Sequence, residues 1–349
     1  MGAWVEIDLD SLLRNAQAIA SRARVPLLPM VKADAYGLGA LPVVRALESL
    51  SPWGYGVATI AEGAELRAAG ITRPIVVFTP LLLGDLDAAR REGITPALGT
   101  PETIAAWAPT GAPWHLAIDT GMNRAGVPWG AVGDLELRER PPDGAFTHFH
   151  SADCDDASMK QQLGRFREAI ARLPARPRFL HAENSPALER LTGPSAWDLV
   201  RPGVFLYGVG KTAEPVATLR AHVVDIRTIA AGESVSYGAT YRAATPRRVA
   251  TLALGYADGY RRAFSNRGRA IVNDREVPVV GTVTMDMTMI DVTDVPCMVG
   301  DVATVLGRAG ARVLDAVTVA EGGGVSPYEL LVGLALRAER IYTNSAVYT

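Results

Sequence analysis

The first two thirds of the chain alternate between short runs of β-forming residues and longer amphipathic stretches. Strands that alternate with helices form a parallel sheet, and eight such repeats over about 200 residues fit a closed (β/α)8 barrel better than an open sheet. This alternation limits the fold more than any other feature. The predicted barrel strands are Leu27–Ala33, Gly54–Thr59, Pro74–Phe78, Thr95–Gly99, Trp114–Asp119, Ala145–His150, Arg178–Ala182 and Val200–Tyr207, and the predicted helices include Ala40–Ser49, Ile60–Ala69 and Asp155–Leu173.

The last third has a different pattern, because short strands follow one another with Gly, Pro, Asn and Asp between them. We therefore predict an α/β protein with an N-terminal TIM-type (β/α)8 barrel, residues 8–212, and a mainly β C-terminal domain, residues 213–349. We expect the strand-like residues 1–7 to pair with the β domain. Its predicted strands are Ala221–Ile229, Arg248–Leu254, Arg269–Val272, Val277–Val283, Thr288–Val292 and Val302–Leu306, followed by a helix over Ser326–Gly333.

Composition and charge exclude several classes of function. The 349 residues are 48% hydrophobic and 21% charged, so the chain can fill a large core and disorder is not expected. A net charge of −2 gives no reason to expect a nucleic acid or a membrane as partner. The sequence shows no signal peptide and no bilayer-spanning run, so we expect a cytoplasmic protein. Cys154 and Cys297 lack metal-ligand spacing, which predicts free thiols and no metal site.

Chemically active side chains gather at the predicted carboxyl ends of the barrel strands, where such barrels place their catalytic groups. Lys32 ends the first strand, and desolvation at the rim of a core lowers the pKa of an amine and makes it nucleophilic. Such a lysine is suited to a Schiff base with a carbonyl cofactor such as pyridoxal phosphate. Other side chains at strand ends are Arg124, His148, His181 and Arg201.

A phosphate group fits the same end of the barrel. The loops after the seventh and eighth strands are the usual phosphate site of this fold. Ser185 and the backbone N–H groups of Gly203 and Val204 are placed to bind it, since glycine permits close backbone approach. Tyr36, just after the first strand, is also predicted to reach this phosphate.

These residues belong to motifs that make the chain similar to the alanine racemase family. Val31–Gly37 (Val-Lys-Ala-Asp-Ala-Tyr-Gly) resembles that family's cofactor-lysine motif. Matching stretches run in the family's order from Ile7–Asp8 to Arg340–Tyr342, so the resemblance covers nearly the whole chain. The further motifs are Asp119–Arg124, Thr147–Phe149, His181–Ser185, Arg201–Gly203, Val235–Tyr241, Gly255–Tyr260 and Val280–Asp286.

The resemblance implies a pyridoxal phosphate-dependent isomerase that interconverts L- and D-alanine with one base on each face of the substrate. Lys32 resembles the cofactor lysine and first base, and Tyr237 resembles the second. A phenol has an ordinary pKa of about 10 and is a poor base at neutral pH, so its phenolate needs a stabilising neighbour, for which His148 is the family's candidate. Arg201 resembles the arginine at the pyridine nitrogen, which its permanent charge leaves unprotonated.

The resemblance also implies contacts to substrate and a quaternary arrangement. Arg124 resembles a residue that contacts the cofactor's phenolic oxygen and the substrate carboxylate, Met285 a second carboxylate contact through its backbone, and Tyr256 a residue of the entryway. Tyr36, Asn184, Ser185, Gly203 and Val204 match further cofactor-binding positions. In the family, the β-domain residues complete the site of the partner in a head-to-tail homodimer, and the product D-alanine is a peptidoglycan precursor.

Two positions depart from the family pattern, and they leave the substrate open. Ala117 stands where the family commonly has a lysine, often carbamylated, that positions the arginine corresponding to Arg124. Leu336 replaces a tyrosine that contributes to phosphate binding and the entryway. A serine-specific or broad-specificity racemase therefore remains an alternative. A decarboxylase is disfavoured by Arg201 and Tyr237, and a non-catalytic cofactor-binding protein is disfavoured by the β domain.

Overall fold

The computed structural model describes residues 2–138, 140–334 and 336–343. The chain divides into two compact units. The barrel unit contains Ala16–Ala35 and Leu47–Phe205, and the β unit contains the described residues of Met1–Asn15, Tyr36–Ala46 and Leu206–Thr349. We describe each unit by itself.

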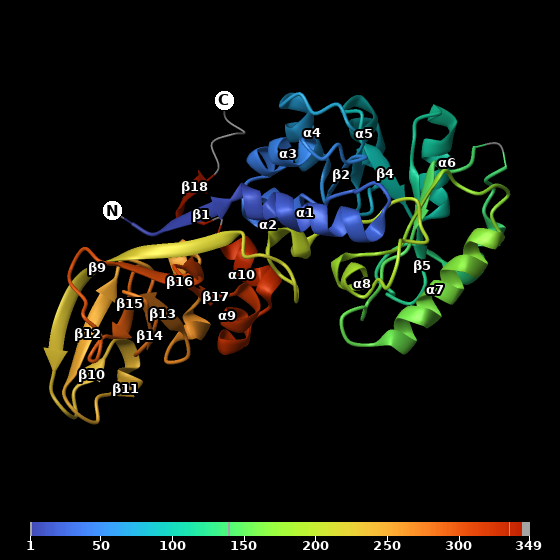
Figure 1. Cartoon of the computed structure of the whole chain (residues 1–349). Coiled ribbons are helices and arrows are strands. Elements are labelled where there is room, and N and C mark those ends of the chain that lie inside the picture. The colour runs from blue at the N-terminus through green and yellow to red at the C-terminus, as the bar shows by residue number, and fades with distance from the viewer. Residues whose placement is uncertain (1, 139, 335, 344–349) are drawn as a thin grey trace. The chain divides into compact units, whose positions relative to one another are not determined.

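The barrel unit is built around parallel strands that follow one another in chain order (Figure 1). Parallel bridges close the ring, because Leu27 pairs with Val200, Met30 pairs with Gly56 and Asn184 pairs with Arg201. Six strands and two bridged segments thus give the eight positions of a (β/α)8 barrel, and the predicted fold class is confirmed. The strands are β2 (Tyr55–Val57), β3 (Ile75–Val77), β4 (Thr95–Leu98), β5 (His115–Asp119), β7 (Gly144–Phe146) and β8 (Phe179–His181).

The helices between these strands begin at residues whose side chains bind free backbone N–H groups. In α4 (Ile60–Ala68), Thr59 and Glu62 form a reciprocal capping box. In α7 (Asp156–Ala171), Asp155 accepts from the N–H groups of Ala157 and Ser158. The predicted helices are confirmed to within two residues at either end. The other helices of the barrel unit are α5 (Leu86–Arg91), α6 (Pro101–Trp107) and α8 (Ser185–Glu189), whereas α1 (Leu9–Ala23) and α3 (Ala40–Glu48) each have residues in both units.

The predicted strand over Ala145–His150 is wrong at its carboxyl end. β7 stops at Phe146, so His148 lies in the loop after the strand. The carbonyl groups of Thr147 and His148 accept hydrogen bonds from side chains instead of from a neighbouring strand. The position of His148 in this loop is consequently fixed by hydrogen bonds from side chains to the loop backbone and not by pairing in the sheet.

The predicted strand over Val200–Tyr207 is also wrong beyond its first two residues. Val200 and Arg201 form bridges to neighbouring segments, the carbonyl of Pro202 accepts from the N–H of Met30 at 2.8 Å, and η4 (Val204–Tyr207) is a 3-10 helix. Pro202 has no N–H to donate to a sheet, which explains why pairing ends there. The sequence also gave no signal for β6 (Val127–Pro128), a short strand that pairs in parallel with β5.

The β unit is organised by the long strand β9 (Ala217–Ile229). Its first half pairs with β1 (Trp4–Asp8) and β16 (Val302–Ala309), and its second half pairs with β12 (Arg247–Leu252). β1 also pairs in parallel with β18 (Glu339–Thr343). The other elements are β10 (Ser234–Val235), β11 (Tyr241–Arg242), β13 (Arg269–Val272), β14 (Arg275–Pro278), β15 (Thr288–Asp291), β17 (Arg312–Leu314), α9 (Ala316–Gly323) and α10 (Pro327–Gly333).

Replacing Gly54 by alanine should weaken the barrel. A Cβ at this position would lie 2.3 Å from the carbonyl oxygen of Pro74, which accepts the N–H of Tyr55 and begins the pairing of β2 with β3. We expect Gly54→Ala to reduce the free energy of unfolding by about 1–3 kcal/mol, as overpacked substitutions do. Gly84→Ala, in open space, should change it by less than about 0.5 kcal/mol. Urea denaturation of both variants checks this, and equal effects would contradict it.

Candidate active site

Lys32 stands directly after the last paired residue of the first barrel segment. The N–H of Val31 donates to the carbonyl of Gly56 at 2.8 Å, and pairing ends there. The Lys32 side chain is half-buried. Desolvation lowers the pKa of its amine, the positive charge of Arg124 lowers it further, and the negative charge of Glu62 raises it. The amine is therefore closer to its neutral, nucleophilic form than a surface lysine is.

The predicted strand over Leu27–Ala33 is wrong at its end, because the chain turns into a left-handed helical conformation after Lys32. Ala33, Asp34, Ala35 and Tyr36 all have φ between 52° and 56°. Residues other than glycine rarely adopt this conformation, which costs roughly 1–2 kcal/mol each. The turn is closed by the N–H of Ala35, which donates to the carbonyl of Val31 at 2.8 Å. Four strained residues beside a nucleophilic lysine point to a functional constraint on the backbone.

Arg201 places a permanent positive charge inside the barrel unit, with only 3% of the residue exposed. One terminal nitrogen donates to Nδ1 and to the carbonyl of His181, both at 2.8 Å. The other donates to the carbonyls of Thr147 and Ala182, at 2.7 and 3.0 Å. Four terminal hydrogens are thereby used, and Nε–H is the one guanidinium donor outside these bonds. Burial lowers the pKa of Arg201 to about 9, which leaves it charged at neutral pH.

Two buried histidines, His181 and His115, extend the hydrogen-bonded chain that begins at Arg201. Because an arginine can only donate, Nδ1 of His181 must be an acceptor. The neutral His181 ring then carries its proton on Nε2, which donates to Nδ1 of His115 at 2.9 Å. Desolvation and the charge of Arg201 lower the pKa of His115 to about 3 and hold that of His181 well below its ordinary value. Both rings are neutral, with fixed tautomers.

His148 is held from behind by a buried glutamine. Nε2 of Gln162, on α7, donates to the carbonyl of His148 at 3.0 Å and to Oγ1 of Thr120 at 3.2 Å. Desolvation is the largest of the effects that lower the pKa of His148 to about 3, and the charges of Arg201, Arg124 and Lys32 act in the same direction. His148 is therefore a neutral ring that can form hydrogen bonds but supplies no positive charge.

Arg124 lies on a loop whose backbone is ordered by the side chain of Asp119. Oδ1 of Asp119 accepts from the N–H groups of Gly121 and Asn123, at 2.8 and 3.1 Å. After Arg124 the chain returns to pair with β5 through β6. The guanidinium is exposed, and among the described residues it forms no hydrogen bond or ion pair. No described side chain takes over the task of the lysine missing at Ala117.

The predicted phosphate-binding groups lie together in the barrel unit. The N–H of Gly203 donates to Oγ of Ser185 at 2.8 Å, which joins the loops after β8 and after the eighth segment. Asn184 caps the start of α8, where its side chain accepts from the N–H of Ala187 at 3.3 Å. Val204 follows Gly203 as the first residue of η4. Ser185, Gly203 and Val204 therefore bring a hydroxyl and backbone amides to one place, where the amide of Gly203 is bonded to the oxygen of Ser185.

Tyr36 belongs to the β unit and is buried. Its ring stacks on that of Tyr207 with centroids 4.7 Å apart, and it lies 6.4 Å from the ring of Tyr328. Desolvation raises the pKa of its hydroxyl, so Tyr36 is a neutral hydrogen-bonding group. This suits a phosphate contact and not a base.

Tyr237, Tyr256 and Met285 are carried by adjoining loops of the β unit. Oγ1 of Thr282 donates to the carbonyl of Tyr237 at 2.8 Å. The N–H groups of Tyr256 and its successor donate to the carbonyls of Thr284 and Met285, at 3.0 and 3.1 Å. Tyr237 is 75% exposed and Met285 is 52% exposed. The structure thus brings together three predicted site residues from distant parts of the sequence.

An arginine secures the loops of Tyr256 and Met285 from the far end of the chain. Arg337 donates to both carboxylate oxygens of the buried Asp258, at 2.7 and 2.9 Å, and to Asp286 at 2.7 Å. Asp258 in turn accepts from the N–H of Gly255 at 2.8 Å. Leu336, at the position where the family has a tyrosine, is 66% exposed.

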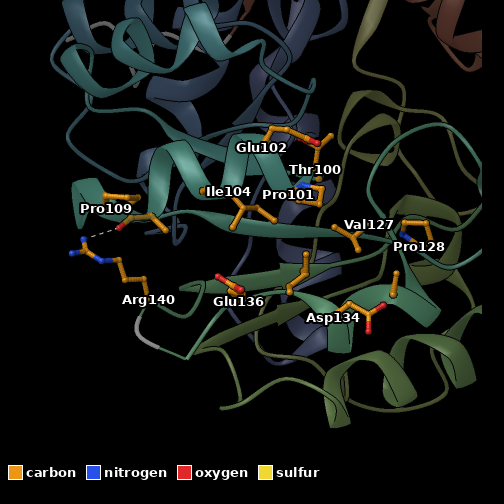
Figure 2. Close-up of a pocket in the computed structure, with 15 residues that line it drawn as sticks. Thr100, Pro101, Glu102, Ile104, Pro109, Val127, Pro128, Asp134, Glu136 and Arg140 are labelled. Carbon is orange, nitrogen blue, oxygen red and sulfur yellow. Dashed lines mark hydrogen bonds between the residues drawn. The ribbon is translucent and has the colours of Figure 1, made fainter.

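Other features of the described residues do not compete with this site. A surface pocket of about 810 Å3 lies between α6 and the segment after β6, but none of the predicted site residues lines it (Figure 2). Its charged lining groups are Glu102, Asp134, Glu136 and Arg140. Within the described residues, no three His, Cys, Asp or Glu side chains are grouped to hold a metal, and no helix is long and apolar enough to cross a bilayer. Cys154 and Cys297 are free.

Comparison with known proteins agrees with this geometry. The family model for the alanine racemase N-terminal domain matches residues 7–211, and that for the alanine racemase C-terminal domain matches residues 216–342. The chain belongs to the alanine racemase family. A curated alanine racemase from Symbiobacterium thermophilum is 36% identical over 97% of this chain and 96% of its own. One from Citrifermentans bemidjiense is 37% identical over 97% and 98%.

Solved structures of alanine racemases have the same fold. The protein from Bartonella henselae, solved with covalently bound pyridoxal phosphate, has a TM-score of 0.90 and 28% identity, covering 98% of this chain and 99% of its own. The protein from Streptomyces lavendulae has a TM-score of 0.90 and 32% identity, covering 99% and 97%.

Two residues that support the site of this alanine racemase family member were not among the predicted site residues. They are His115, on β5, and Gln162, on α7. Both are 1% exposed. A polar residue at an apolar position of a strand or helix is the available signal, because buried polar groups need partners.

The buried histidines should leave a signature in solution. Histidines of an unfolded chain have a pKa of about 6.5. Since the pKa values of His115 and His148 are about 3 in the folded protein, the unfolded chain alone takes up these protons as the pH falls from about 6.5 towards 3. The free energy of unfolding should therefore decrease over this interval. NMR of 15N-histidine-labelled protein should show His115, His148 and His181 neutral at pH 5, with the exposed His150 as reference. Titration of any of the three between pH 5 and 7 would contradict the assignment.

Proposed function

We propose that this protein is an isomerase that interconverts L- and D-alanine with pyridoxal phosphate as its cofactor. The observation that carries the proposal is that Lys32, Arg124 and His148 interact electrostatically with one another. The charge of Arg124 acts on the amine of Lys32, and both charges act on the ring of His148. This cluster occurs in a chain of the alanine racemase family, and the solved relative from Bartonella henselae carries covalently bound pyridoxal phosphate.

The donor set of the barrel unit fits this cofactor. The lowered pKa of Lys32 suits an amine that bonds a carbonyl carbon. Ser185, Gly203 and Val204 offer hydrogen-bond donors for a phosphate, and Arg201 offers Nε–H for a ring nitrogen. A guanidinium keeps its proton in such a contact, so the ring nitrogen stays unprotonated. We propose that Tyr36, Asn184, Arg124 and His148 complete the cofactor site.

Two residues of this chain are proposed to move the Cα proton. Pyridoxal phosphate, when bound, delocalises the electron pair that remains at Cα after the proton leaves. Nζ of Lys32 takes or returns the proton on one face, and the phenolic oxygen of Tyr237 does so on the other. Because the ring of His148 is neutral, it would support a phenolate as a hydrogen-bond donor and not as a cation.

The remaining site residues are assigned to the substrate. We propose that Arg124 binds the carboxylate through charge-assisted hydrogen bonds, that the backbone of Met285 adds a second contact, and that Tyr256 lines the entryway. We further propose a head-to-tail homodimer in which Tyr237 of the partner subunit faces Lys32. We propose that the enzyme acts in the cytoplasm and supplies D-alanine for peptidoglycan.

Lys32→Ala should abolish the reaction. We expect the variant to lose the visible absorbance of the lysine-bound cofactor and to lower kcat by about 10²- to 10⁴-fold or more, since it removes both the anchor and a base. Optical rotation of L-alanine added to the loaded protein measures racemisation. Lys160→Ala, at an exposed lysine of α7, is the matched control. Retention of both signals in Lys32→Ala would refute the role. A panel of L-amino acids that included serine would decide between alanine and a broader preference.

Tyr237→Phe should impair proton abstraction on one face of the substrate and not on the other. The variant retains the ring but not the phenolic oxygen, so proton abstraction from one enantiomer should fall by about 10²- to 10⁴-fold while KM changes little. Solvent deuterium incorporation into each enantiomer measures the two directions independently. Tyr241→Phe, on β11 of the same unit, serves as control. Equal exchange from both enantiomers in Tyr237→Phe would count against a two-base reaction.

A further inference from the structure

The carboxylate of Glu62 bridges two strand ends of the barrel unit. Oε1 accepts from the N–H of Ala33 at 2.7 Å, and Oε2 accepts from the N–H of Ala58 at 2.7 Å and of Thr59 at 3.2 Å. Ala33 directly follows Lys32, and Ala58 directly follows β2. The two segments are neighbours in the barrel, since Met30 pairs with Gly56. One side chain therefore connects the loop that carries Lys32 to the next strand end.

The bond to Ala33 has a specific structural purpose. Ala33 is the first of the residues in the left-handed turn, and the first N–H groups of any helical turn lack partners inside it. Glu62 supplies that partner from α4. Because the turn is unfavourable for alanine, aspartate and tyrosine, it needs contacts from outside to persist. The bond to Glu62 is made at the residue adjacent to the lysine.

The same carboxylate contributes to the charge balance around the amine. Among the described residues, three charged or titratable groups interact electrostatically with Lys32: Arg124 from the loop after β5, His148 from the loop after β7 and Glu62 from α4. His148 is neutral, and Arg124 is positive. Of these three, Glu62 alone opposes the effect of Arg124 and of desolvation on the amine.

We propose that Glu62 is a positioning residue for Lys32, whose carboxylate fixes the peptide after the lysine and supplies the negative charge that faces its amine. The proposal rests on the proposed function, because it gives Lys32 the role of cofactor lysine and base. Nothing in the capping box of α4 requires the bond to Ala33. A helix cap alone would need only Thr59 and the N-terminus of its own helix.

Selective labelling of lysines can test this on the protein without its cofactor. The sequence has three lysines, and Lys160 and Lys211 are exposed and serve as internal references. Reductive methylation with formaldehyde, followed by mass spectrometry of the Lys32 peptide across a pH series, reports the titration of that amine. In Glu62→Gln, loss of the opposing charge should move the Lys32 profile to lower pH, while the two references stay in place.

Turnover of the loaded protein gives the second readout. We expect Glu62→Gln to lower kcat by about 10- to 100-fold with a smaller change in KM, because small displacements of a catalytic group cost rate. Glu62→Asp keeps the charge but is too short to reach both Ala33 and Ala58. It should therefore retain most of the labelling profile and still lose kcat, and it provides a test if Glu62→Gln does not fold.

Thr59→Ala separates positioning from helix stability. Thr59 caps α4 by accepting from the N–H of Glu62 at 3.2 Å, and among the hydrogen bonds of the described residues its side chain forms none with Ala33. Its variant should lose stability but keep the Lys32 profile and kcat. An unchanged Lys32 profile in Glu62→Gln, or an equal shift in Thr59→Ala, would overturn the proposal. A wild-type protein that binds no cofactor and racemises no amino acid would instead overturn the proposed function, whatever Glu62 does to the amine.

Discussion

The site depends most on the hydrogen bonds of the buried Arg201 guanidinium. A charge that is 3% exposed is tolerated only if its hydrogens are bonded. The partners are carbonyls of Thr147, His181 and Ala182 and one imidazole nitrogen. These acceptors come from the ends of β7 and β8, so satisfying the charge also fixes the two loops that follow. Desolvation, together with the same charge, keeps the neighbouring histidines neutral. The hydrogen bond from Arg201 to Nδ1 of His181 then sets their tautomers and extends the fixed arrangement to β5.

Local patterns in the sequence predicted the barrel but not its strand ends. Short β-forming runs between amphipathic stretches placed most of the strands and the capped helices α4 and α7. They failed at Lys32, His148 and Val204 for two physical reasons. At each point the backbone leaves the sheet because of a distant partner or a proline: the left-handed turn held through Ala33, the carbonyls that Gln162 and Arg201 bind, and Pro202. Intrinsic propensity carries no information about such partners.

The roles assigned to the site residues stay predictions. Beyond desolvation, the charge of Arg124 lowers the pKa of Lys32 and both charges lower that of His148, and Tyr237, Tyr256 and Met285 lie on adjoining loops of the β unit. The sequence alone did not predict how they are supported. His115, Gln162, Glu62 and Arg337 fill supporting roles through contacts between residues far apart in the chain, or between a helix and a loop. Such contacts leave no periodic signal, whereas the residues that carry the chemistry stand in short motifs.

The protonation of Lys32 depends on how Arg124 is held, and Ala117 stands where the family resemblance implies a lysine that positions Arg124. Arg124 lowers the pKa of the amine and Glu62 raises it, so the proton on Lys32 depends on how firmly each charge is held. Glu62 is fixed by backbone bonds to Ala33 and Ala58, whereas Arg124 depends on the loop ordered by Asp119. A carboxylate bound at Arg124 would offset its charge and favour protonation of the amine. If Arg124 binds the substrate carboxylate as proposed, substrate binding and the protonation of Lys32 are coupled through Arg124, and an arginine held only by its loop is the more adjustable of the two charges.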